Sequence, residues 1–491
     1  MPISMRDMVV VLPGITGSVL QKNGKDVWVL TGQALSRFLR TRGRELRELR
    51  IASSDDFTAD DLDDGIRATT LMPDAHIVPG LWKVDGYGTL AKFLRQEFEF
   101  AQGKNYFELP YDWRRDNRVA ARKLEYLIAE KLPEWREFSG NHHAKVILVA
   151  HSMGGLISRY YLEIAEGWKN CRALITFGTP YRGSVKSLNF LANGHSVAGV
   201  NLTEVLRTCT SVYQLLPTYA VVQVDSGETV HVKDLMDLSW LDPVRAAEAQ
   251  AFHQKISDAI DAHQKLESYR RDLTVWPIVG TDQPTLQSAK LSQGKLAASM
   301  DLPANVNPLL GFGDGTVPMA SAIPLEMSKV FTMPFHAEVH GSLQNNRQIL
   351  RSFREWLRQS QVEGLENLKA VAADPKAMDE RPEVRLSIED RPAIQLSVQD
   401  QYWEGEPVRM EAQVRASGEP DRVTATIYPI GREADPIEKA FQRVGDRWLM
   451  ECDRLEEGCY RVRVRCAGEN LDDPPPPVAD IFSVSTSVLD A

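Results

Sequence analysis

The segment that decides the fold is KVILVAHSMGGLISRYYLEI, residues 145–164. A run of β-branched and other apolar residues ends at Ala150, Ser152 follows almost at once, and Gly154 and Gly155 open an amphipathic stretch. This order predicts a buried strand, a sharp turn that carries the serine, and a helix whose start stabilises negative charge beside it. Small residues at 150 and 154 leave room for such a turn. The alternative is a serine in an ordinary tight turn between a strand and a helix.

The same alternation of short apolar runs and amphipathic stretches extends from residue 8 to about residue 360. It is typical of a parallel sheet whose two faces are covered by helices. The expected strands are Met8–Leu12, Tyr106–Leu109, Lys145–Ala150, Ala173–Phe177, Thr274–Val279 and Val330–Met333. The expected helices are Arg118–Glu130, Gly154–Ala165 and Leu343–Arg358.

Two regions depart from this alternating pattern, namely an insertion and the part of the chain after residue 365. They determine the domain organisation that we expect. Within a main domain of residues 1–365, residues 184 to about 270 form an insertion, which we interpret as a cap over an active site. Residues 366–380 are mostly polar or small and predict a linker. From residue 381 to residue 491 the apolar period falls to two and a Gly445-Asp446 pair predicts a hairpin turn, which together favour an antiparallel β-sandwich.

A serine nucleophile needs a base, and the base needs a carboxylate to orient it. The segment GFGDGTVP at 311–318 supplies Asp314 in a late loop, although this pattern also suits a simple turn. Two histidines follow the last expected strand, and we choose His340 because it precedes the last helix and Gly341 gives its loop room; His336 is the alternative. The two histidines could chelate zinc only on a helix, whereas the residues before them read as a strand, so no metal is expected.

Ester chemistry also needs two backbone N–H groups that bind the developing oxyanion. We expect one from Met153, the residue after the serine. The other would come from Ile15 in VVVLPGITGSVL at 9–20, where an early strand ends at a Pro-Gly pair. The alternative for this second segment is a glycine-rich turn of purely structural use.

Composition excludes some functions. The 491 residues carry 57 Lys and Arg against 67 Asp and Glu, a net charge of −10, which argues against nucleic acid as a partner. The five cysteines include no C-x-x-C pair, which suits a reducing compartment. No secretion signal or spanning segment is recognisable, so we expect a cytoplasmic protein.

Taken together, eight pieces of the chain resemble the lecithin:cholesterol acyltransferase-like α/β-hydrolases, which include phospholipases A. In order, the pieces are LPGITGSVL, LPYDWRRD, AHSMGGLISRYYLE, TFGTPYRGS, SVYQLLP, IVGTDQPT, GDGTVP and HGSLQNN. The resemblance implies an α/β-hydrolase fold with a mobile cap and action on ester bonds of lipid-like substrates. It assigns Ser152 as nucleophile, Asp314 as acid and His340 as base, with Ile15 and Met153 as oxyanion donors.

We therefore expect a serine esterase or lipase, of lipase or phospholipase type, that works through an acyl-enzyme and needs no cofactor. One alternative is an acyltransferase that moves the acyl group to an alcohol. Another is a catalytically silent hydrolase fold that serves as a binding or scaffold protein. The expected partners are a lipid or ester substrate, a membrane surface contacted by the cap, and an unknown ligand or protein for the sandwich.

Overall fold

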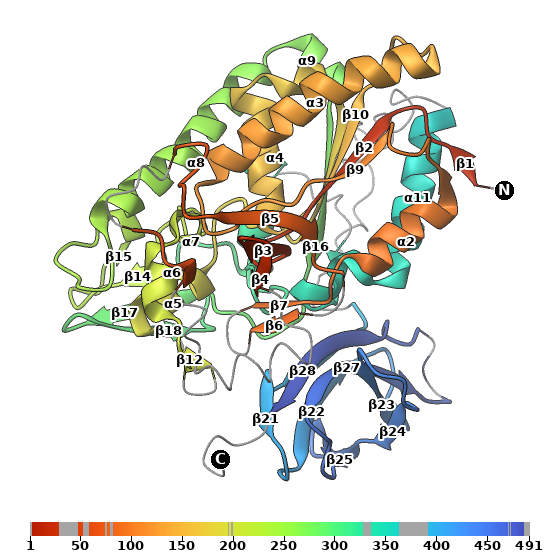
Figure 1. The fold of residues 1–491 in the computed structure, drawn as a ribbon. Helices are drawn as coiled ribbons and strands as arrows, with labels where there is room; N and C mark the ends of the chain where they lie inside the picture. The colour runs from red at the N-terminus through yellow and green to blue at the C-terminus, as the bar shows by residue number, and fades with distance from the viewer. Residues whose placement is uncertain are drawn as a thin grey trace, which may run out of the picture.

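The molecule consists of a larger α/β unit and a β-sandwich formed by the C-terminal residues (Figure 1). The structure is a computed structural model. It describes residues 2–28, 48–52, 58–73, 76–78, 82–194, 196–197, 200–327, 335–362, 391–469, 471 and 473–485. The predicted linker at 366–380 therefore lies outside the described residues.

In the described residues, six strands form the central sheet of the α/β unit, in the order β19-β16-β11-β10-β2-β9. Each strand runs parallel to its neighbours, as predicted. The strands are β2 (Met8–Leu12), β9 (Tyr106–Glu108), β10 (Val146–His151), β11 (Cys171–Phe177), β16 (Thr274–Gly280) and β19 (Phe335–His336). The first five match the predicted segments closely, whereas the predicted strand Val330–Met333 falls outside the described residues.

Helices cover both faces of this sheet (Figure 1). On one side α4 packs between α3 and α8, and on the other side α2 lies against α11. Their bounds are α2 (Gly88–Glu97), α3 (Asn117–Ser139), α4 (Met153–Ile164), α8 (Pro243–His263) and α11 (Arg347–Val362). Among the described residues no helix is both long and apolar enough to cross a lipid bilayer.

The last helix begins later than the predicted Leu343. The chain first forms a 3₁₀ turn, η6 (His340–Asn345), and α11 starts at Arg347. The reason is a cap: the Asn346 side-chain oxygen accepts hydrogen bonds from the N–H groups of Gln348 and Ile349, at 2.8 and 3.2 Å.

Residues 184–270 contain several short elements and one long helix, and the last short element, α9, ends two residues beyond them. The short elements are α5 (Val185–Asn193), β12 (Ser196–Val197), β13 (Val200–Asn201), α6 (Thr203–Thr208), α7 (Thr210–Tyr213), β14 (Val222–Gln223), β15 (Thr229–Val230), η3 (Val232–Asp234) and α9 (Glu267–Asp272). The long helix, α8, packs on α4, where the Phe252 and Tyr160 rings stack 5.3 Å apart. The second half of this insertion therefore lies beside the sheet.

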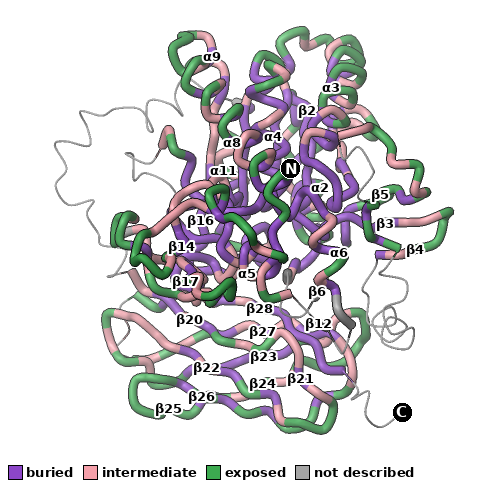
Figure 2. The backbone as a smooth tube through the Cα atoms, turned by 90° about the vertical axis from the view of Figure 1, so that its left-hand side faces the viewer, coloured by how far each residue is buried: buried purple, intermediate pink, exposed green. Residues whose placement is uncertain are grey.

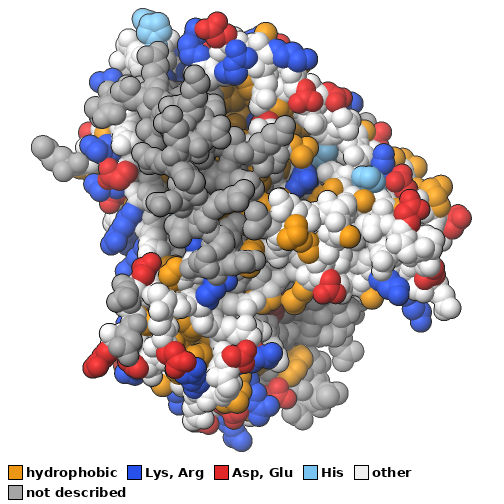
Figure 3. Space-filling model, turned by 180° about the vertical axis from the view of Figure 1, so that it is seen from behind, with side chains coloured by type: hydrophobic (Ala, Val, Ile, Leu, Met, Phe, Trp, Pro, Cys, Tyr) orange, Lys and Arg blue, Asp and Glu red, His pale blue; other side chains and the backbone are white. Residues whose placement is uncertain are grey.

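Smaller elements complete the α/β unit. They are β1 (Ile3–Ser4), β3 (Ser18–Lys22), β4 (Lys25–Trp28), β5 (Ile66–Leu71), β6 (His76–Val78), β7 (Trp82–Val84), β8 (Phe98–Glu99), η2 (Gly167–Lys169), β17 (Ser288–Ser292), β18 (Lys295–Ser299), η4 (Pro308–Leu310), α10 (Met319–Ala322) and η5 (Leu325–Met327). Of these, β6 and β7 pair as a hairpin, and Figure 1 shows this hairpin between the central sheet and the sandwich. Seen from behind, acidic and basic side chains are interspersed over the surface (Figure 3).

The sandwich has two sheets, with strand orders β20-β22-β26-β25 and β21-β28-β27-β23-β24. Its strands are β20 (Ala393–Val398), β21 (Gln401–Trp403), β22 (Val408–Arg415), β23 (Arg422–Ile430), β24 (Ile437–Ala440), β25 (Gln442–Val444), β26 (Arg447–Cys452), β27 (Gly458–Ala467) and β28 (Val478–Ser485). Buried residues alternate with more exposed ones along β22 and β26, whereas β23 and β28 are buried over most of their length (Figure 2). The predicted hairpin at Gly445 is confirmed, because Val444 pairs with Arg447. The predicted antiparallel sandwich is confirmed with one exception, because β21 enters the second sheet parallel to β28.

Candidate active site

Ser152 lies in the sharp turn between β10 and α4. Its backbone φ is 51°, in the left-handed region that a non-glycine residue rarely adopts. The turn is held on both sides, because the Ser152 N–H donates to the Phe177 carbonyl at 2.9 Å and the Thr179 hydroxyl donates to the Ser152 carbonyl at 2.9 Å. The strained serine turn that the sequence predicted is thus present in the structure.

The two glycines after the serine are required by close packing. A Cβ atom on Gly154 would lie 2.5 Å from the Pro13 carbonyl oxygen, which is main chain and cannot swing away. A Cβ on Gly155 would overlap the Thr179 side chain. The first turn of α4 therefore packs closely on the end of β2 and on the residues that follow β11.

His340 joins Ser152 and Asp314 in one line of hydrogen bonds. Its Nε2 atom lies 2.9 Å from the Ser152 Oγ atom, and its Nδ1 atom lies 2.7 Å from Asp314 Oδ2. All three residues are buried. Because an ionised carboxylate only accepts hydrogen bonds, Nδ1 carries the proton and Nε2 is left to accept from the serine hydroxyl.

The Asp314 carboxylate has further donors. Its Oδ1 atom accepts from the N–H groups of Thr316 and Val317, at 3.0 and 2.7 Å. The Asp314 carbonyl in turn accepts from the His340 N–H at 2.8 Å. The loop of GFGDGTVP thus fixes both the carboxylate and the backbone of the histidine that it orients.

Two glycines that sequence reasoning did not single out make room for this pair. A Cβ on Gly178, whose φ is +57°, would lie 2.8 Å from His340 Nδ1 and 2.9 Å from Asp314 Oδ2. A Cβ on Gly280 would lie 2.5 Å from the Asp314 Cβ. Each glycine directly follows or ends a central strand, at β11 and β16, and that position is the sequence signal that could have identified them.

The Pro-Gly segment after β2 reaches the serine as well. Gly14 packs so close that a Cβ there would lie 2.9 Å from the Ser152 Cβ. The next residue, Ile15, is buried beside it, and Met153 is buried at the start of α4. Both predicted oxyanion residues are therefore near Ser152, and their catalytic role stays a prediction.

A second buried histidine, also missed from sequence, connects these parts. His151 Nε2 lies 3.1 Å from the His340 carbonyl oxygen, and His151 Nδ1 lies 2.9 Å from the Tyr87 hydroxyl. That hydroxyl accepts from the Gly14 N–H at 2.7 Å. Burial lowers the pKa of His151 to about 3, so the ring is neutral. Its Nε2–H therefore donates to the His340 carbonyl, and its Nδ1 accepts from Tyr87.

His336, the alternative base, lies at the end of β19. Burial lowers its pKa to about 4. The histidine that the structure brings to Ser152 is His340. Among the described residues, no group of three or more His, Cys, Asp and Glu side chains is placed to hold a metal ion.

Comparisons with known proteins agree with the resemblance seen in the sequence. The family model for lecithin:cholesterol acyltransferase matches residues 62–307, half of the chain. The human lysosomal phospholipase A and acyltransferase is 31% identical over 128 residues, which are 24% of this chain and 30% of that protein. The chicken phosphatidylcholine-sterol acyltransferase is 29% identical over 175 residues, 31% of this chain and 41% of that protein. These matches thus span less than half of each relative's length.

Two solved structures are also similar in part. The phospholipase PlaB from Legionella pneumophila is 10% identical, with a TM-score of 0.31 over 82% of this chain and 89% of that chain. A lipase from Bacillus licheniformis, in its mature form, is 14% identical, with a TM-score of 0.30 over 73% of this chain and 94% of that chain. With half of its residues matched by the family model, the chain belongs to the lecithin:cholesterol acyltransferase family.

Proposed function

We propose that this protein is a serine hydrolase that cleaves carboxylic ester bonds of lipid-like substrates, of lipase or phospholipase type. The observation that carries the proposal is the line of hydrogen bonds from the Ser152 hydroxyl through the His340 ring to the Asp314 carboxylate. Membership of a family whose named relatives include phospholipases supports the choice of lipid esters.

In the proposed reaction, His340 Nε2 takes the proton of the Ser152 hydroxyl as the oxygen attacks the acyl carbonyl. The N–H groups of Ile15 and Met153 stabilise the oxyanion of the tetrahedral intermediate. As this intermediate collapses, the imidazolium returns the proton to the leaving alcohol, and an acyl-serine remains. A water molecule then attacks the acyl-serine while His340 accepts its proton, and the serine leaves with that proton. Asp314 keeps the imidazole in the required tautomer.

In this proposal the part of residues 184–270 that precedes α8 serves as the cap and contacts the lipid surface, because α8 itself packs beside the sheet. Support comes from their first residue, because the Ser184 hydroxyl donates to the Thr316 carbonyl in the loop that carries Asp314. The sandwich at the C-terminal end is a further contact site for a ligand or protein. A cytoplasmic location fits five cysteines that are all unpaired.

A second candidate function is acyl transfer to an alcohol in place of water. The observation that favours it is the name of the human relative, a phospholipase A and acyltransferase. The two reactions share the acyl-serine, so the geometry around Ser152 serves both. Product analysis with a long-chain alcohol in the assay separates them, since only transfer yields the long-chain ester.

The test is a set of esters of increasing acyl length, assayed with the wild type, Ser152→Ala and the control Ser139→Ala. Ser139 is an exposed residue at the end of α3. We expect Ser152→Ala to lose at least about four orders of magnitude in turnover, and the control to lose nothing. A fluorophosphonate probe should label the wild type at Ser152. A loss of less than tenfold removes Ser152 from the mechanism, and an unlabelled wild type favours a silent binding protein.

A further inference from the structure

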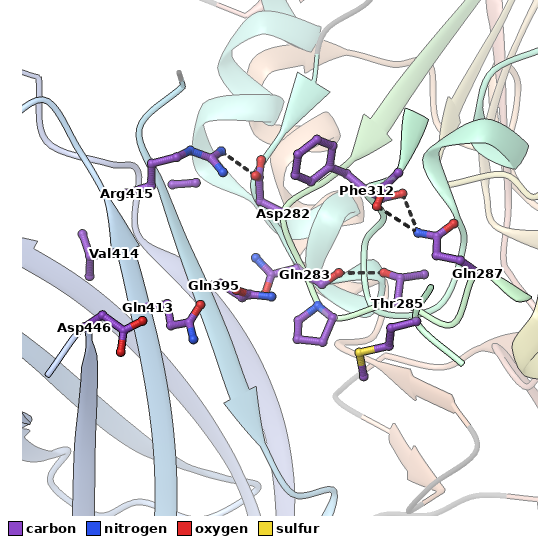
Figure 4. A pocket seen from close by; sticks show the side chains of 14 residues that line it. Asp282, Gln283, Thr285, Gln287, Phe312, Gln395, Gln413, Val414, Arg415 and Asp446 are labelled. Atoms are coloured by element: carbon purple, nitrogen blue, oxygen red, sulfur yellow. Dashed lines mark hydrogen bonds and ion pairs between the residues drawn. The ribbon is translucent and has the colours of Figure 1, made fainter. Parts of the chain in front are cut away.

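The sandwich touches the α/β unit at the loops that carry Asp314 and His340. The first contact is made by the side chain of Gln283, in the turn after β16 (Figure 4), and we call its two hydrogen bonds to β20 the clasp bonds. The Gln283 side-chain amide donates to the Ile394 carbonyl at 3.1 Å and accepts from the Leu396 N–H at 3.2 Å, so it pairs with β20 as another strand would. The Gln283 backbone N–H donates to the Gly313 carbonyl at 2.9 Å, one residue before Asp314.

The second contact is made by the two residues before His340. Val339 packs against the hydrophobic core of the sandwich. The Glu338 carboxylate accepts from the Ala479 N–H of β28 at 3.0 Å and from the Asn346 side chain at 2.6 Å. Glu338 is buried, and burial raises its pKa to about 7. A buried acid whose partners lie on both units fixes the backbone that leads into the histidine.

The third contact passes through β7. The Lys83 ammonium lies 2.6 Å from Asp400 and 2.9 Å from Asp480, both in the sandwich. Burial by itself would lower the pKa of Lys83, but the two carboxylates outweigh it and raise the pKa above its ordinary value. The Lys83 backbone packs so tightly on Gly341 that a Cβ there would overlap the Lys83 carbonyl. The ion pairs therefore hold β7 in contact with Gly341, the residue that follows His340.

These contacts matter for the loop of His340. Among the described residues, the strand that leads to this loop, β19, lies at the edge of the sheet, where Phe335 and His336 pair with β16. Strand β10, which leads to Ser152, is paired along its length on both sides. Backbone at a sheet edge needs support from elsewhere if a catalytic group is to stay within about 0.5 Å of its working position.

We propose that the C-terminal sandwich is a positioning module of the active site, which holds the loops of Asp314 and His340 in register with Ser152. The inference rests on the proposed function, and it assigns Gln283 and Val339 as positioning residues, since neither contacts the reacting atoms. The other reading is that the sandwich only stabilises the fold, in which case the contacts affect unfolding but not the geometry of the site.

The experiment compares the wild type with Gln283→Met and Val339→Ala in the full chain. Gln283→Met keeps the side-chain length but removes both clasp bonds, and Val339→Ala removes the packing into the sandwich. The control is Arg409→Gln, which breaks an exposed ion pair with Glu451 within the sandwich. Three quantities are measured: kcat and KM on an ester, the rate of Ser152 labelling by a fluorophosphonate, and the low-field NMR signal of the His340 Nδ1–H. His340→Asn assigns that signal.

We expect each variant to lower kcat and the labelling rate about tenfold or more with KM unchanged, and to shift or weaken the His340 signal. The control should match the wild type. Folded variants with wild-type kcat and a wild-type signal would overturn the proposal. If a variant does not fold, the milder Asp480→Asn, which weakens the third contact, replaces it under the same criteria.

The NMR signal separates this proposal from the proposed function. A wild type that shows the signal but does not label, with variants that lose the signal, would refute the hydrolase and keep the positioning role. A wild type that lacks the signal would refute the positioning role, because Asp314 and His340 would then not be held together.

Discussion

The turn of Ser152 and the loops of Asp314 and His340 are held in two different ways. Ser152 takes its backbone bonds from Phe177 and Thr179 within the sheet region. The other two loops are braced by residues far along the chain, with separations of 111 residues for the bond from Gln283 to Ile394 and 141 for the bond from Ala479 to Glu338. The turn of Ser152 is therefore held by the sheet region, whereas the proposed base, His340, depends in our proposal on a second folding unit.

The largest effect on activity should come from the local region. In Gly154→Ala the new Cβ meets the carbonyl oxygens of Pro13 and Leu12, at 2.5 and 2.9 Å, so β2 and α4 must separate. That movement displaces the donors proposed for the oxyanion, and loss of one such donor costs about 10²–10³ in kcat. We expect a loss of about a hundredfold in kcat, measured by steady-state kinetics. Ser139→Ala, at the exposed end of α3, is the control, and an unchanged kcat in Gly154→Ala would contradict the local account.

The largest effect on stability should come from the other region. Lys83→Met removes the ammonium group that pairs with Asp400 and Asp480, and breaking a buried ion pair costs about 3 kcal/mol. The free energy of unfolding, measured with urea, should fall by about that amount and recover in part when Asp480→Asn is added. Equal stability of Lys83→Met and wild type would mean that the ion pairs do not brace the interface.

The difference between the turn of Ser152 and the loops of Asp314 and His340 also explains what could be predicted from the sequence. The turn of Ser152 lies within twenty residues of strand, turn and helix pattern, and the structure matches it. The partners of His340 were chosen by chain order, and the hydrogen bonds agree with that choice. Late in the chain the prediction was less exact, because η6 delays the start of α11.

The contacts that could not be predicted from the sequence join residues far apart in the chain. Nothing near Gln283 or Glu338 shows that β20 and β28 will lie against them, since hydrogen bonds between units leave no periodic pattern. The same is true of Tyr87 and His151, which are 64 residues apart and meet as buried polar groups. The available signal was His151 itself, a polar residue at the end of an apolar strand. A buried polar group of this kind requires hydrogen-bond partners.

Tyr87→Phe breaks the link between the two regions. The hydroxyl accepts from Gly14 beside Ser152 and donates to His151, which holds the His340 carbonyl. Its removal leaves the buried Gly14 N–H without that acceptor, at a cost of about 1–3 kcal/mol. We expect that loss in unfolding free energy, together with a severalfold drop in kcat at unchanged KM. A variant that loses stability with full kcat would limit this link to a structural role. Tyr126→Phe, at an exposed tyrosine, is the control.

A further effect concerns how the free energy of unfolding depends on pH. Because burial raises the pKa of Glu338 from 4.5 to about 7, the folded protein holds a proton between these values that the unfolded chain has lost. The stabilisation from this group is full below pH 4.5 and disappears as pH rises through 7, with a slope of up to about 1.4 kcal/mol per pH unit. Glu338→Gln should remove this slope from urea unfolding curves at pH 5, 6 and 7. If the unfolding free energies of Glu338→Gln and wild type changed equally between pH 5 and pH 7, this prediction would be refuted.

The same slope distinguishes the two regions. Glu338 lies two residues before His340 and bonds to the sandwich, so the pH dependence that it causes belongs to the loops braced from outside. Gly154→Ala disturbs the packing of α4 on β2 but none of the contacts with the sandwich described above, so it should keep the wild-type slope even though its activity is far lower. Should Gly154→Ala flatten the slope as Glu338→Gln does, the two regions would be one cooperative structure, and the contrast between a locally held Ser152 turn and an externally held His340 loop would fail.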